Sequence, residues 1–262
     1  MNKYLENCKK YSNGVLLLAI IGIIFLVYFI ILLFFRRKEL IKFKFKLEKI
    51  DYFIFLIWII LLIFIIFFFD NTVAFDISNK YPKGILSHYS KLNIELTSIF
   101  KFISYLGEPN YVALVISPIF LYAKWKKNKN LENTILATIF IMLIGSIIST
   151  VFKVFFMRSR PFQEWNNLGF YLIEDVFENE IPFKGKYMSF PSGHTMVAFC
   201  SYCFLAFMSK KNWQKFFLFS LAILIGLSRI YLSAHWASDV IASAGIAIFL
   251  AKKYSESLKN DL

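Results

Sequence analysis

Several apolar stretches of the chain have the length that a helix needs to cross a lipid bilayer, which is about 20 residues. The clearest runs from Gly14 to Phe35 and contains no charged residue, and the second runs from Tyr52 to Phe69. Two more, Thr134 to Phe156 and Phe216 to Leu232, contain one charged residue each. These stretches predict an integral membrane protein built from helices.

Three shorter apolar runs give further spans, at Tyr111 to Ala123, Thr195 to Met208 and Trp236 to Ala251. The composition agrees, because 58% of the residues are hydrophobic and the mean hydropathy of +0.59 exceeds that of a soluble domain. The first span lacks a small-residue cleavage site and is followed directly by Arg36-Arg37-Lys38, so we expect it to remain as a helix and not to be removed as a signal peptide. The predicted fold class is all-α, with seven membrane helices.

Basic residues gather beside alternate ends of these spans. Seven, four, three and three Lys or Arg residues lie in the segments 36–51, 124–130, 209–215 and 251–262. The positive-inside rule places these segments in the cytoplasm, although the lysines of the N-terminal tail run against it. The loops 70–110 and 157–194 are then expected outside. The net charge of +13 is explained by this topology, so no nucleic-acid partner is expected.

Ionisable side chains inside or at the edge of a membrane span are costly and usually mark function. The residues of this kind are Lys153, Arg160, Arg229, His235 and Asp239. The predicted topology puts all of them near the outer face. Cys200 and Cys203, by contrast, lie in an apolar span without further Cys or His at metal-binding spacing, and we expect buried thiols there.

Lys153 and Arg160 are seven residues apart, which is two turns of a helix, so we expect both on one face of a helix that ends before Pro161. Two cations at a helix end suit a multiply charged anion. For Arg158 and Arg160 alone, a second interpretation is equally good, in which the side chains snorkel to the lipid headgroups. The deeper position of Lys153 favours an anion site.

The segment Phe190-Pro191-Ser192-Gly193-His194 precedes an apolar span and is typical of a helix start, with Ser192 as the N-cap. Free N–H groups at a helix N-terminus suit phosphate, and Gly193 lets an anion approach the backbone. His194 is then expected beside that anion. A routine turn between a loop and a helix would give the same short string, so alone the segment is only suggestive.

His235 and Asp239 are four residues apart, a spacing that places them on one face of a helix within hydrogen-bonding reach. A carboxylate on one imidazole nitrogen fixes the tautomer and leaves the other nitrogen free to attack. The alternative is an interfacial histidine beside an unrelated Asp, which would be expensive inside a span. The third histidine, His88, is expected to be a solvated loop residue.

Three motifs together resemble the signature of the type 2 phosphatidic acid phosphatase superfamily. They are Lys153, six residues, Arg160-Pro161; then Pro191-Ser192-Gly193-His194; and then Ser228-Arg229, five residues, His235, three residues, Asp239. All three occur in the order and with the internal spacings of that family. The resemblance covers Tyr52 to about Ala251, and it implies a six-helix phosphatase core preceded by one extra N-terminal transmembrane helix.

The resemblance also implies a role for each matching residue. His235 would be the nucleophile that forms a phosphohistidine, Asp239 would orient it, and His194 would protonate the leaving oxygen. The phosphate oxygens would be held by Lys153, Arg160, Ser192, Gly193 and Arg229. The family needs no metal ion or other cofactor. Cations and helix N–H groups can supply the charge stabilisation that phosphoryl transfer requires.

The expected function is hydrolysis of a lipid phosphate in the cell membrane, with the active site on the extracytoplasmic side. Undecaprenyl diphosphate, phosphatidic acid and phosphatidylglycerol phosphate are candidate substrates, among which phosphate-contacting residues cannot choose. The composition resembles that of bacterial proteins and slightly favours undecaprenyl diphosphate. A lipid phosphotransferase with the same site and an anion transporter are the alternatives. The expected division is an N-terminal helix with a basic connector (1–51), a phosphatase domain (52–252) and a cytoplasmic tail (253–262). The oligomeric state does not follow from the sequence.

Overall fold

The computed structural model describes residues 2–40, 47–70, 94–161 and 187–260, and every regular element within these ranges is a helix. In chain order they are α1 (Asn2–Leu40), α2 (Lys49–Phe64), its π-helical continuation η1 (Ile65–Asp70), α5 (Ile94–Tyr105), α6 (Pro109–Trp125), α7 (Lys129–Phe156), α9 (Gly193–Ala198), η4 (Phe199–Cys203), α10 (Phe204–Met208), α11 (Asn212–Tyr231) and α12 (Ala237–Asn260). The prediction of an all-α fold is confirmed.

The predicted spans all coincide with helices. Those long and apolar enough to cross a membrane are Leu17–Arg36, Lys49–Phe68, Lys129–Phe156 and Asn212–Tyr231. The segment Gly193–Met208, which comprises α9, η4 and α10, is a shorter apolar helix. The two other short predicted spans are parts of α6 and α12.

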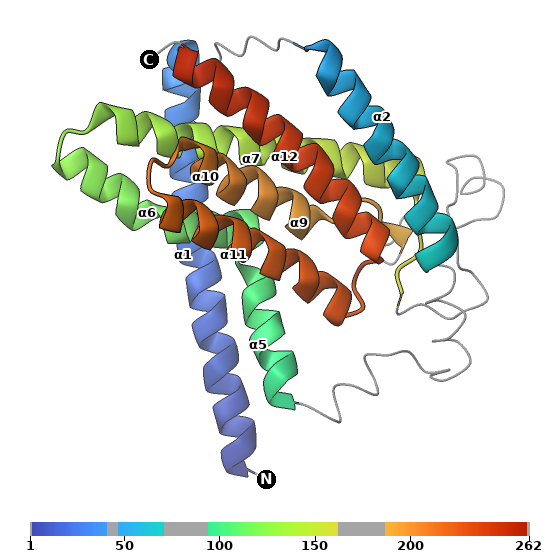
Figure 1. Cartoon of the computed structure of the whole chain (residues 1–262). Coiled ribbons are helices and arrows are strands. Elements are labelled where there is room, and N and C mark those ends of the chain that lie inside the picture. The colour runs from blue at the N-terminus through green and yellow to red at the C-terminus, as the bar shows by residue number, and fades with distance from the viewer. Residues whose placement is uncertain (1, 41–46, 71–93, 162–186, 261–262) are drawn as a thin grey trace.

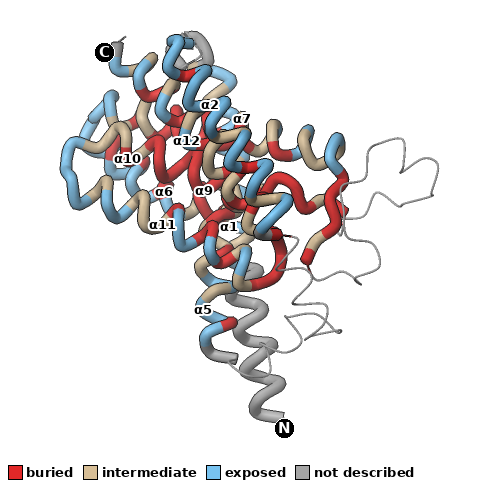
Figure 2. Tube along the Cα trace, turned by 45° about the vertical axis from the view of Figure 1, so that its right-hand side comes forward, coloured by how far each residue is buried: buried red, intermediate tan, exposed pale blue. Residues whose placement is uncertain are grey.

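The helices α7, α9 to α10, α11 and α12 pack side by side around a common core (Figure 1). Met142 of α7, Cys200 of η4 and Phe204 of α10 are fully buried in that core. Tyr254 is also fully buried, stacked on Phe204, so residues 253–260, which we assigned to a cytoplasmic tail, continue α12 as a packed helix. Figure 2 shows buried segments in the middle of this group of helices, whereas most of α2 is exposed.

The extra N-terminal helix α1 packs along α6. Its Phe29 is fully buried and makes an edge contact with Phe120 of α6, with ring centroids 5.1 Å apart. Near its end, Arg36 lies 3.4 Å from the buried carboxylate of Glu132 on α7. The helix is therefore joined to the core by packing and by charge.

Because consecutive helices of the core run in opposite directions, four helix ends meet at one end of the bundle, here called the site end. It comprises the C-terminal ends of α7 and α11 and the N-terminal ends of α9 and α12, on the right of Figure 1. The last residue of η1, Asp70, is buried there as well. The opposite end carries the connections from α6 to α7 and from α10 to α11.

The prediction that one helix runs as far as Arg160 is wrong. Helix α7 ends at Phe156, and Met157 closes it in the left-handed conformation with φ of 30°, its N–H bonded to the carbonyl of Lys153. Arg158 then leaves the helix, and its carbonyl accepts a bond from the N–H of Ser189. Lys153 and Arg160 consequently belong to different elements and do not share a helix face.

Candidate active site

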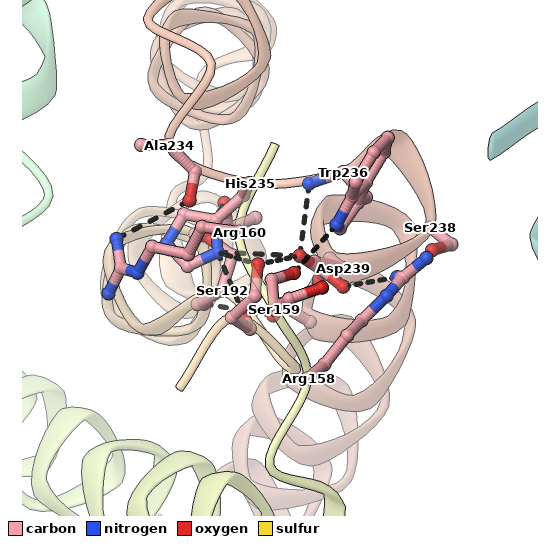
Figure 3. Close-up of polar contacts among 12 residues, drawn as sticks. Arg158, Ser159, Arg160, Ser192, Ala234, His235, Trp236, Ser238 and Asp239 are labelled. Carbon is pink, nitrogen blue, oxygen red and sulfur yellow. Dashed lines mark hydrogen bonds and ion pairs between the residues drawn. The ribbon is translucent and has the colours of Figure 1, made fainter. Parts of the chain in front are cut away.

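Hydrogen bonds tie the three sequence motifs to one another at the site end. The first and third motifs are joined where Arg160 donates to the carbonyl of Ala234 over 3.3 Å. The second and third are joined where the N–H of Ser192 donates to the carbonyl of Asp239 over 3.2 Å. Figure 3 shows these segments converging on one cluster of polar side chains. The sequence-predicted residues are thus brought together from α7, α9, α11 and α12.

His235 lies in the loop that joins α11 to α12, two residues before α12 begins, and not on a helix as we predicted. Its Nδ1 is 2.8 Å from the carbonyl oxygen of Ser189 and 3.5 Å from Oδ2 of Asp239. A carbonyl can only accept a hydrogen bond, so Nδ1 carries the proton. The tautomer therefore leaves Nε2 with a free lone pair, as a nucleophile requires.

Asp239 is fully buried and binds residues next to His235. Its Oδ2 accepts bonds from the hydroxyl of Ser189 over 2.5 Å and from the N–H of Trp236 over 3.0 Å. The carboxylate thus fixes the residues on both sides of the His235 imidazole. Ser189 was missed in the sequence, because a serine two residues before Pro191 carries no pattern that distinguishes it.

The pKa of His235 is lowered to about 3, chiefly because the imidazole is buried, and further because Arg160 and Arg229 lie nearby. Asp239 acts in the other direction but does not offset burial. Since a lowered pKa keeps the ring neutral at ordinary pH, the lone pair on Nε2 is available.

Three cations, Lys153, Arg160 and Arg229, lie near one another at the site end, close enough to interact electrostatically. The Nζ of Lys153 lies close to Gly193, 2.9 Å from the position that a Cβ on the glycine would occupy. Arg229 donates from Nη1 to the hydroxyl of Ser104 on α5. Its Nε is buried without a hydrogen-bond partner among the described residues. Cations and a helix start of this kind suit the oxygens of a phosphate.

His194, the second residue of α9, is partly exposed, and its Nε2 is 3.2 Å from Oε1 of Glu108. Glu108 is the N-cap residue of α6. A protonated His194 forms an ion pair with this carboxylate, which fixes the direction of the ring. Glu108 could not be identified from the sequence, because it is one of many loop carboxylates and lies 86 residues from its partner.

Arg158 is buried, with 6% of its surface exposed, so the interpretation of this side chain as snorkelling to the headgroups is wrong. Its Nη1 lies 2.6 Å from Oδ1 of Asp239, and its Nη2 lies 2.9 Å from Oδ2 of Asp70. Ser238 accepts a bond from the same Nη1 and donates to Asp70. Figure 3 shows the Arg158 guanidinium beside Asp239 and Ser238.

Comparison with known proteins places this arrangement in a family, since residues 134–259 match the model of the PAP2 superfamily. This part of the chain belongs to the PAP2 superfamily. It is similar to phosphatidylglycerophosphatase B of Bacillus subtilis, with 35% identity over 83 residues that make up 27% of this chain and 41% of the relative. It is also similar to lipid A 1-phosphatase of Porphyromonas gingivalis, with 39% identity over 66 residues, or 24% of this chain and 15% of the relative.

The chain therefore spans well under half the length of either of these relatives. No solved structure matches it. The PAP2 region contains every site residue predicted from the sequence. Three residues that contact the site lie before this region, namely Asp70, Ser104 and Glu108. The first half of the chain thus completes the surroundings of the PAP2 residues.

Proposed function

We propose that the protein is a membrane phosphatase that hydrolyses a lipid phosphate through a phosphohistidine on His235. The observation that carries this proposal is the tautomer of His235, whose Nδ1 proton is held by the carbonyl of Ser189. Arg160 and Arg229 lie near this imidazole and Lys153 lies near both arginines, so three cations are available for a phosphate at this site. The PAP2 match and the lipid phosphatases among its relatives support the same chemistry.

In the first step, Nε2 of His235 attacks phosphorus and the bond from phosphorus to the leaving oxygen breaks. His194 gives its proton to that oxygen, so that the lipid leaves as an alcohol, or as a lipid monophosphate when the substrate is a diphosphate. In the second step, water gives a proton to the now neutral His194 and attacks phosphorus, the P–N bond returns its electron pair to Nε2, and inorganic phosphate is released. Splitting the reaction in this way makes each step easier.

The phosphate oxygens would be held by Lys153, Arg160 and Arg229, and by the N–H groups at the start of α9, where Ser192 and Gly193 lie. Phosphoryl transfer depends mainly on positioning and on stabilising the charge of the phosphoryl oxygens. Asp239 takes no part in bond making and keeps the His235 loop in place.

The site end is proposed to face the extracytoplasmic side of a cell membrane. This orientation is supported by the basic segments, because 124–130 and 209–215 lie at the opposite end of the bundle and are the type that stays in the cytoplasm. A substrate whose chain lies in the bilayer could then present its phosphate to the site end. Phosphatidylglycerol phosphate, phosphatidic acid and undecaprenyl diphosphate remain the candidate substrates, and the name of the Bacillus relative favours the first.

The decisive experiment incubates the purified protein with each candidate lipid in the presence of a chelator and follows free phosphate. Release of phosphate from at least one lipid without an added acceptor supports a hydrolase that needs no metal. Release only after a second lipid or a sugar is added would show a phosphotransferase instead. No release under any condition would reject the proposed function.

The pH dependence of kcat/KM provides a further prediction. We expect a bell-shaped profile, because His235 must be neutral and His194 protonated. Since the pKa of His235 is lowered, its neutral form persists as the pH falls. The acid limb should therefore lie below the usual histidine range near 6.5. A profile measured with the purified protein that rises or falls in one direction only would contradict the paired roles.

A further inference from the structure

We propose that Arg158 and Asp70 are positioning residues for the nucleophile, a role that rests on the proposed function. They act through Asp239 and do not touch the phosphate. Arg158 occupies one of the six unspecified positions of the first motif, and Asp70 lies outside both the motifs and the PAP2 region.

The two oxygens of Asp239 have separate tasks. Oδ1 accepts the guanidinium of Arg158 over 2.6 Å, whereas Oδ2 accepts Ser189 and the N–H of Trp236 over 2.5 and 3.0 Å. The planar guanidinium of Arg158 bridges two carboxylates, because Nη1 contacts Oδ1 of Asp239 and Nη2 contacts Oδ2 of Asp70. Arg158 thus holds Oδ1 in place while Oδ2 binds the residues beside the His235 imidazole.

Asp70 fixes the other side of the guanidinium. Its Oδ2 lies 2.9 Å from Nη2 of Arg158, and Ser238 bridges the two by accepting from Arg158 and donating to Asp70. Asp70 is 2% exposed, and both charges are therefore withdrawn from solvent. The chain of contacts runs from the end of η1 through Arg158 to Asp239, so an element outside the PAP2 region holds the nucleophile loop.

Arg158 also balances charge. His235 faces the carboxylate of Asp239 on α12, the guanidinium of Arg160 after α7, and the guanidinium of Arg229 on α11. With Arg158 removed, the Asp239 carboxylate beside Nδ1 would lose the cation in direct contact with it, and only the more distant Lys153 and Arg160 would offset its charge. The carboxylate would then favour the imidazolium more strongly. Arg158 thus helps to keep His235 neutral as well as correctly placed.

The test measures kcat, KM and the pH profile of Arg158→Gln on the lipid that the wild-type protein hydrolyses. We expect kcat to fall by about 100-fold and KM to change by less than about threefold, since the three phosphate-facing cations remain. The acid limb of kcat/KM should move to higher pH. Arg158→Lys keeps the charge without the planar fork, so it should recover the position of the acid limb but only part of kcat.

A matched control is Arg36→Gln, which breaks another ion pair to a buried carboxylate, that of Glu132 near the opposite end. It should lower thermal stability without moving the acid limb. Arg158→Gln leaves the carboxylates of Asp70 and Asp239 without their shared cation, which could impair folding. The double variant D70N/R158Q removes the charge of Asp70 as well. It should show the same shift of the acid limb as Arg158→Gln.

The inference is overturned if the folded Arg158→Gln protein keeps the wild-type kcat, or if its kcat falls without a shift of the acid limb. It is also overturned if Arg36→Gln shifts the acid limb by the same amount. Each variant is compared with the active wild-type protein, so these results test the contacts among Asp70, Arg158 and Asp239 and not the proposed function. If the wild-type protein releases no phosphate, the proposed function fails instead.

A second inference concerns a groove at the opposite end of the bundle, and it does not rest on the proposed function. The groove has a volume of about 890 Å³ and lies between the α6–α7 connection, the α10–α11 connection and the last turn of α12. Its walls include Ile135, Leu205 and Phe217. This size and lining are typical of a binding site for a small molecule with an apolar part.

Lysines supply the polar part of this groove. Lys210, Lys211 and Lys259 line it, and no Asp or Glu is among the described residues that do so. Lys259 is held at the groove by a bond from Nζ to the carbonyl of Phe207 over 2.7 Å. Exposed Trp213 lies beside them, a residue type that favours the level of the headgroups. We infer that the groove binds one anionic phospholipid of the surrounding leaflet, with its chains on the apolar wall and its phosphate near the lysines.

Native mass spectrometry of the purified protein can count the lipid molecules retained from added phosphatidylglycerol or phosphatidylcholine. We expect phosphatidylglycerol to be retained preferentially, and K210Q/K211Q/K259Q to weaken its binding by about fivefold for each lysine. The matched control K126Q/K127Q/K252Q removes three exposed lysines outside the groove lining and should keep the preference.

Equal retention of the two lipids by the wild-type protein, or an equal loss in both triple variants, would overturn this inference. A competition measurement with millimolar inorganic phosphate tests whether the groove binds the lipid or only its phosphate group. If it displaces phosphatidylglycerol, the groove binds a free anion and the lipid assignment is wrong. If phosphatidylglycerol stays bound, the lipid chains contribute to binding as inferred.

Discussion

Replacement of His235 by Ala should abolish phosphate release, with a fall in kcat of at least about 10⁴-fold. The variant retains the cations of the site but has no Nε2 to attack phosphorus, and the residual rate would come from binding alone. After brief exposure to labelled substrate and an alkaline quench, the wild-type protein should carry acid-labile phosphate, and the variant should carry none.

His88→Ala is the natural control for this experiment, because it removes the remaining histidine that no motif includes. It should retain both turnover and labelling. Turnover by the His235→Ala protein above about a hundredth of the wild-type rate would mean that another group attacks phosphorus. In that case the phosphohistidine mechanism would have to be abandoned, whereas the proposed hydrolysis of a lipid phosphate would not be contradicted.

His194→Asn should lower kcat on a lipid phosphate by about 10²–10⁴-fold, the usual effect of losing a general acid. The expected loss depends on the leaving group. An alkoxide must be protonated as it departs, whereas a nitrophenolate leaves without a proton. With a nitrophenyl phosphate ester that the wild-type protein accepts, the first step should survive in the variant and release a burst of nitrophenol.

The second step needs a base to activate water, and His194 is in that state once it has given up its proton. The variant should therefore accumulate phosphohistidine after the burst, which the same quench would reveal. An equal loss of activity on both kinds of ester would show that His194 contributes only to binding. Glu108→Gln retains a side chain that can hydrogen-bond to His194. It should also lose more activity on a lipid phosphate than on the nitrophenyl ester, but by a smaller factor than His194→Asn.

The fold was predictable where the hydrophobic pattern was long and continuous. The spans at Gly14 to Phe35 and Thr134 to Phe156 could be placed to within a few residues, because a bilayer demands an uninterrupted apolar helix. The end of α7 could not be placed. Pro161 suggested a helix up to Arg160, but the helix stops at Phe156, and Arg158 instead forms buried ion pairs with two distant carboxylates.

The site was predictable to the extent that its residues follow fixed spacings. The motifs named His194, His235 and Asp239, and the fold brings their segments to one end of the bundle. Sequence spacing could not show that the carbonyl of Ser189 is the nearer partner of the nucleophile, since a backbone acceptor leaves no trace in residue type. Nor could it identify Glu108, because the pairing depends on how α6 begins beside α9.

The buried carboxylate of Glu132 has a consequence for the size of the smallest folding unit. It is 3% exposed and is compensated by Arg36 from α1 and by Lys129 one turn away. A chain shortened to begin after α1 would lose one of these two cations and would also uncover the α6 surface on which Phe29 lies. Helix α1 is accordingly part of the folded core of this protein, and the borders of the PAP2 region do not mark where the chain could be shortened.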